Sequence, residues 1–69
     1  MIADHLAQAE QHVAEARVHV KRQREIVAEL QRDGHDTREA QRLLDNFIAL
    51  ERSHAADRDR LRDQLAKAR

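Results

Sequence analysis

The chain has one glycine and no proline, and the glycine lies almost at the midpoint of its 69 residues. Gly34 can adopt the left-handed backbone conformation that ends many helices, because it has no Cβ to clash. Asp36 follows as a candidate N-cap, whose carboxylate accepts from the free N–H groups of a first helical turn. Glu39, three positions later, completes a capping-box pattern. These signals predict two helices that are joined by a short turn at residues 34–36.

A heptad pattern of apolar residues runs through both expected helices, about 3–33 and about 37–67. In the first helix it has two columns: Leu6, Val13, Val20 and Val27, then Ile2, Ala9, Ala16, Gln23 and Leu30. In the second helix the central column is Ala40, Phe47, His54, Leu61 and Ala68. A short connection makes two such helices antiparallel neighbours. The predicted fold is therefore all-α, a single helical-hairpin domain over residues 1–69 with a coiled-coil seam.

Folding the chain about Gly34 predicts which residues of the two helices face each other. The expected pairs are Leu30 with Ala40, Val27 with Leu43, Gln23 with Phe47, Val20 with Leu50, and Ala16 with His54. Gln23 interrupts an apolar column. It is expected either to set the register as a buried polar residue or to extend to the edge of the seam.

One seam between two helices removes little apolar surface from water, and so short a chain is seldom stable through that seam alone. Four apolar side chains are expected to lie outside the seam and to stay partly exposed: Leu44, Ile48, Ile26 and Val18. A second hairpin packed across them would form an antiparallel four-helix bundle. We therefore expect a homodimer, or pairing with another amphipathic helix, through these four residues.

Composition limits the partners and the location of the protein. Lys and Arg number 13, as do Asp and Glu, and Phe47 is the only aromatic residue apart from histidines. Neither net charge nor aromatic stacking favours nucleic acid, although a basic stripe at Arg17–Arg24 supports weak phosphate binding as an alternative function. The chain has no cysteine, no signal-peptide pattern and no apolar run of about 20 residues. We expect a cytoplasmic location and no membrane partner.

Histidine is enriched, with five copies, and His5, His12 and His19 are spaced seven apart. This spacing corresponds to about 10.5 Å of helix, too far for two of them to share a metal ion within one chain. They are expected to form a half-buried flank of the helix interface or, alternatively, an inter-chain seam that binds metal or senses pH. Glu51 and His54 have the Glu-x-x-His spacing of di-iron bundles. Candidate ligands for a metal site at a dimer seam are therefore Glu51, His54 and His19.

The run from Arg22 to Leu30, the turn Asp33-Gly34-His35-Asp36-Thr37 and the Leu43-Leu44 pair resemble a group of short uncharacterised bacterial helical-hairpin proteins. The resemblance covers most of the chain and implies a bacterial cytoplasmic protein, but no activity. Serine and threonine each occur once, without a plausible triad, and no glycine loop is suited to phosphate. The sequence therefore predicts no catalytic residue, no cofactor and no enzyme. It favours a structural or regulatory interaction module that acts through amphipathic helix faces.

Overall fold

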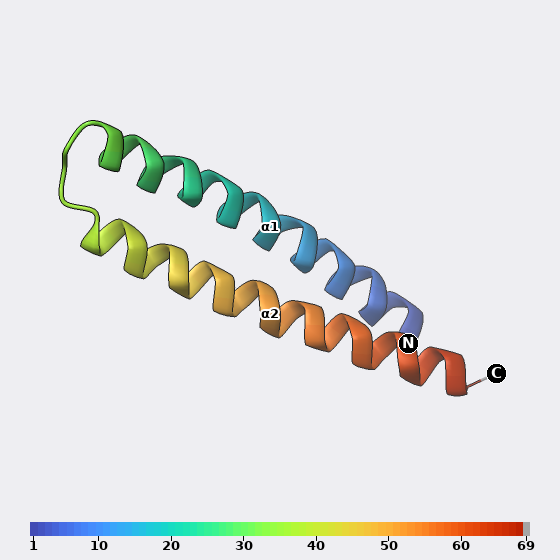
Figure 1. Cartoon of the computed structure of the whole chain (residues 1–69). Helices are drawn as coiled ribbons and strands as arrows, with labels where there is room; N and C mark the ends of the chain where they lie inside the picture. The colour runs from blue at the N-terminus through green and yellow to red at the C-terminus, as the bar shows by residue number, and fades with distance from the viewer. Residues whose placement is uncertain (69) are drawn as a thin grey trace.

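The computed structural model describes residues 1–68, which form two helices and no strand (Figure 1). Helix α1 spans Ile2–Arg32 and helix α2 spans Arg38–Lys67. They pack against each other as an antiparallel hairpin in a rod of 55 × 13 × 13 Å. The predicted all-α hairpin is confirmed, and both ends of each helix lie within one residue of their expected positions. Arg69, which the predicted domain includes, lies outside the described residues.

Gly34 ends α1 as predicted, with a φ of 75° in the left-handed region. The His35 N–H donates to the carbonyl of Leu30 at 2.9 Å, and the Gly34 N–H donates to that of Gln31 at 3.1 Å. This pair of bonds is the Schellman arrangement. It satisfies carbonyl groups that the end of a helix would otherwise leave free.

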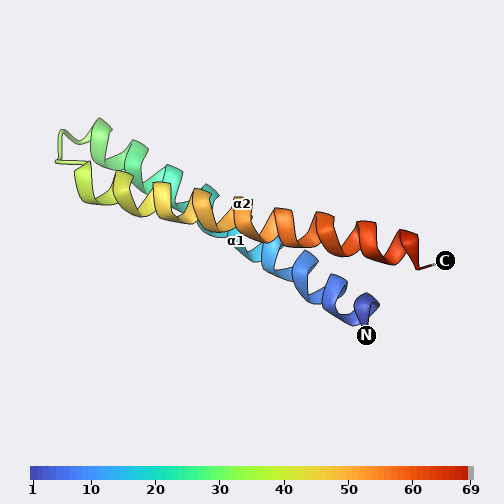
Figure 2. The same ribbon diagram turned by 90° about the horizontal axis from the view of Figure 1, so that it is seen from below.

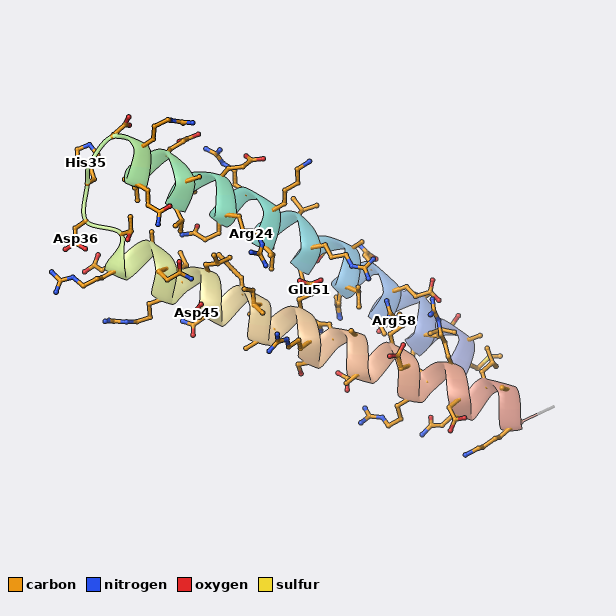
Figure 3. The ribbon with its side chains drawn as sticks, viewed as in Figure 1. Arg24, His35, Asp36, Asp45, Glu51 and Arg58 are labelled. Atoms are coloured by element: carbon orange, nitrogen blue, oxygen red, sulfur yellow. The ribbon has the colours of Figure 1, made fainter. Side chains whose placement is uncertain are left out.

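Asp36 starts α2 differently from the prediction. The N-cap residue is Thr37, whose side chain makes no capping hydrogen bond. Asp36 lies one residue earlier and accepts from the backbone N–H of Arg38 at 3.0 Å, as in an Asx-turn. Its carboxylate also pairs with the Arg38 guanidinium at 2.7 Å, at the connection drawn in Figure 3. The expected capping box with Glu39 is wrong, because Glu39 is the second helical residue rather than the third.

A cluster of buried apolar residues lies in the half of the hairpin nearer the turn. Val20 and Val27 of α1 pack with Leu44, the one buried residue of α2. Phe47 and Ile48 are half-buried against this cluster. In α1 the buried residues follow the expected heptad columns: Ala9, Val13, Ala16, Val20, Gln23 and Val27.

The register of the two helices differs from the predicted one by about a turn or more. Ala40 accepts a hydrogen bond from the Gln23 side chain, whereas the prediction placed Leu30 opposite it. Phe47 stacks on His19, whereas the prediction placed Gln23 there. The prediction assumed that both helices end level at the turn. Instead α1 runs past the start of α2, so each α2 residue meets α1 closer to the N-terminus.

The rotation of α2 about its axis also differs from the prediction. Leu44 is only 5% exposed, whereas Leu43 and Leu50 are 45% and 52% exposed. The expectation that Leu44 lies outside the seam, with Leu43 and Leu50 inside it, is therefore wrong. A heptad seam can step three or four residues beyond Ala40. The three-residue step reaches Leu43 and the four-residue step reaches Leu44. Because both are leucines, the heptad pattern did not show which of them faces α1.

The four predicted interface residues consequently do not form one surface. Leu44 belongs to the core, and Ile48 is half-buried against it. Val18 is 66% exposed on the outer side of α1, two positions and therefore about 200° from the buried Val20. Ile26 is half-buried.

Beyond this cluster the α2 side of the seam contains polar side chains, whereas α1 continues with the buried Ala16, Val13 and Ala9. Glu51 and Arg58 reach from α2 toward α1 (Figure 3), and the Arg58 side chain is only 17% exposed. In Figure 2 the N-terminal end of α1 is set apart from the C-terminal end of α2. In residues 1–68, neither helix has a stretch apolar enough to cross a membrane.

Candidate functional site

One long side of the hairpin carries four of the five histidines. The ring centres of His12 and His54 lie 5.2 Å apart across the two helices, with ring planes tilted by 51°. His19 stacks on Phe47, with centres 5.3 Å apart and planes at 13°. We call this side the histidine flank, defined by His5, His12 and His19 of α1 and by Phe47, Leu50 and His54 of α2.

A shallow groove of about 240 Å³ occupies the middle of the histidine flank. Phe47 and Leu50 give it an apolar wall, and Glu15 also lines it. Glu15 is exposed and accepts a hydrogen bond from the Gln11 side chain at 3.2 Å. The lining residues are His12, Glu15, Ala16, His19, Phe47, Leu50 and His54.

Toward the turn the histidine flank becomes apolar. Ile26 lies seven residues beyond His19, and Leu43 lies seven residues before Leu50, so each stays on the same side of its helix. Leu43 and Leu50 are about half exposed, and Ile26 is half-buried. We extend the histidine flank to include Ile26 and Leu43, and we call Ile26, Leu43, Phe47 and Leu50 its apolar end.

The structure does not bring together the predicted metal ligands Glu51, His54 and His19. Glu51 pairs with Arg17 across the helices, with 3.6 Å between Oε1 and Nε. His54 instead lies against His12. Within residues 1–68, no three or more His, Cys, Asp or Glu side chains form a group ready to hold a metal ion.

The basic stripe between Arg17 and Arg24 is partly neutralised by carboxylates. Arg17 faces Glu51 of α2, and the Arg22 guanidinium lies 3.3 Å from Glu25. In Figure 3 the Arg24 side chain extends from α1 toward α2. A phosphate backbone would therefore meet a weaker positive field than the sequence of this stripe suggests.

The contact between His12 and His54 was missed because the predicted register paired His54 with Ala16. The seven-residue repeat of histidines did indicate that these side chains run beside a heptad column. His5, His12 and His19 are exposed rather than half-buried. Two of the three nevertheless lie against rings of α2.

No protein-family model, curated protein or solved structure matches this chain. The resemblance to short bacterial hairpin proteins stays an expectation.

Proposed function

We propose that the chain is a non-enzymatic structural or regulatory interaction module, which pairs its histidine flank with a second copy of itself in the cytoplasm. The exposed leucines at the apolar end of that flank carry the proposal. Leu43 and Leu50 are 45% and 52% exposed, next to the half-buried Ile26 and Phe47. Covering such a row with apolar side chains is favourable, because it removes the leucines from water.

The surface of one hairpin is large for its mass, which supports a second copy as the partner. A compact monomer of 8.0 kDa is expected to expose about 4,450 Å². This chain exposes 5360 Å², and its radius of gyration is 15.9 Å against about 11 Å for a compact domain of this length. The surplus of about 900 Å² is close to the roughly 800 Å² that each partner buries in a standard interface.

Two hairpins paired in this way would form an antiparallel four-helix bundle. The apolar end would lie in the new core, and the histidines would lie farther along the same contact. The proposal includes no catalytic residue and no cofactor. The lack of cysteine supports a reducing compartment such as the cytoplasm.

Sedimentation equilibrium of the protein without an affinity tag tests this proposal. We expect the mass of two chains at micromolar concentration, and a melting temperature that rises with protein concentration. Leu50→Glu places a charge in the proposed interface and is expected to weaken dimerisation about tenfold or more.

Val18→Glu is the matched control, since Val18 is a comparably exposed apolar residue on the outer side of α1. It should leave the dimer intact. A monomer at every concentration would contradict pairing with a second copy of the chain. Equal weakening by both substitutions would place the interface elsewhere.

A further inference from the structure

We propose that His12 and His54 bind one divalent transition-metal ion, such as Zn²⁺ or Ni²⁺, and that this ion links α1 to α2 within a single chain. The site does not depend on dimerisation, because both imidazoles belong to the same hairpin. It differs from the metal site expected from the sequence, whose ligands Glu51 and His19 point to other partners.

The separation of the two rings fits one shared ion. Zinc–nitrogen bonds of about 2.0–2.1 Å in tetrahedral geometry place the centres of two bound imidazoles about 5 Å apart. The centres of His12 and His54 lie 5.2 Å apart. Their planes are tilted by 51° rather than stacked flat. The proposal requires that one ring nitrogen from each imidazole turns toward the shared ion.

The ligand atoms of this site are imidazole nitrogens, and they determine which metal ions can bind. Zinc, nickel and copper bind it well, whereas magnesium and calcium prefer oxygen ligands. His12 is exposed and His54 is half-buried, and both line the open groove of the histidine flank. An ion can therefore reach the pair from solvent in the unpaired hairpin.

Glu15 can complete the coordination only after its side chain turns toward the imidazoles, since no third ligand stands beside them in residues 1–68. It lines the same groove and lies three residues after His12, a spacing at which helical side chains share metal ions. Its present partner is the exposed amide of Gln11, which costs little to displace. Two imidazoles are then the fixed ligands, and Glu15 and water occupy the remaining tetrahedral positions.

The other histidines of the flank provide controls. His5 occupies the same heptad column of α1 as His12, but its neighbouring surface on α2 consists of Asp57, Arg60 and Leu61. His5→Ala therefore removes one imidazole from the same column while leaving the proposed pair intact.

Calorimetric titration of the tag-free protein with zinc chloride tests the site. We expect one ion per chain, and no binding of magnesium chloride under the same conditions. His12→Ala and His54→Ala should each weaken zinc binding tenfold or more, because one imidazole cannot hold the ion alone. His5→Ala should bind as the parent does, and Glu15→Gln should lose less affinity than either ligand substitution.

Thermal melting followed by circular dichroism gives a second measurement. Zinc should raise the melting temperature of the parent and of His5→Ala, because it binds the folded hairpin in preference to the unfolded chain. It should not do so for His12→Ala. His12 is exposed, so His12→Ala should still fold. The test therefore remains decisive even if His54→Ala fails to fold.

Three results would overturn the proposal. Equal loss of affinity in His5→Ala and His12→Ala would indicate chelation by scattered histidines. One ion per two chains would indicate a site between chains. Unchanged zinc binding in His12→Ala would show that the pair is not the ligand.

Discussion

At Gly34 the backbone conformation, rather than the space around it, restricts substitution. A Cβ at this position would meet no atom within 4 Å, but φ is +75°. Gly34→Val is expected to lower the free energy of unfolding by about 1–2 kcal/mol, because the left-handed conformation brings a Cβ close to the following carbonyl. Gly34→Asn should cost less, since asparagine tolerates this conformation. Urea melts of the three proteins make the comparison, and a valine variant as stable as the parent would contradict the left-handed end of α1.

Asp36 is expected to make the free energy of unfolding depend on pH in the acid range. The Arg38 side chain, and then the Arg38 backbone N–H, donate to the Asp36 carboxylate and hold its pKa below the ordinary value of 3.8. The unfolded chain therefore binds the proton more readily. The contribution to stability is present above the ordinary pKa and is lost as the pH falls through the lower, folded value.

The test is a series of urea melts of the parent and Asp36→Asn between about pH 6 and about pH 2. Asparagine keeps an acceptor for the Arg38 N–H but removes the charge. The parent should lose more stability than the variant below about pH 4, by a small amount because the pair is exposed to water. Identical slopes would show that the pairing of Asp36 with Arg38 is not formed in solution.

Within the helices, the sequence predicted more of the local structure than of the packing. The glycine end of α1 and the heptad columns of α1 depend on nearby residues, and both were predicted correctly. The rotation of α2 depends on whether Leu43 or Leu44 enters the seam, and two adjacent leucines offer the same apolar character. The contact between His12 and His54 depends on that rotation and on how far α1 overshoots the turn. The histidine repeat therefore indicated the flank but not the pair.

Gln23 is the residue at which the register of the two helices can be tested. It is 6% exposed, and its Nε2 donates to the Ala40 carbonyl at 3.0 Å. It does not extend to the edge of the seam, so that alternative is wrong. The Ala40 carbonyl lies inside α2, where a backbone N–H one turn later can also bond to it. Removing the amide therefore leaves no buried acceptor without a partner.

We expect Gln23→Leu to keep the stability of the parent or raise it by up to about 1 kcal/mol, because it exchanges one hydrogen bond for apolar burial. Gln23→Ala should lower stability by about 1–3 kcal/mol, because it leaves a cavity in the seam. Thermal melts at one fixed protein concentration distinguish the two. If the leucine variant loses as much as the alanine variant, the hydrogen bond itself holds the two helices together.

For the molecule as a whole, stability is distributed unevenly along the rod. The cluster of Val20, Val27 and Leu44 lies near the turn. Toward the termini the α2 side of the seam presents Glu51 and Arg58, whose charges must stay hydrated or paired. A hairpin built in this way should open from its free ends, and the histidine pair lies between this cluster and those ends.

Amide hydrogen exchange measures this gradient directly. Local opening costs least where few apolar side chains are buried, so amides near the termini should exchange faster than those beside the core cluster. We expect slow exchange around Val20 and Leu44 and faster exchange around Leu6 and Leu61, which are only half-buried. Measuring at two protein concentrations separates protection within one hairpin from protection by dimerisation, since only the second changes with concentration. Equal protection in both halves at low concentration would show that the polar part of the seam holds the helices as firmly as the apolar core does.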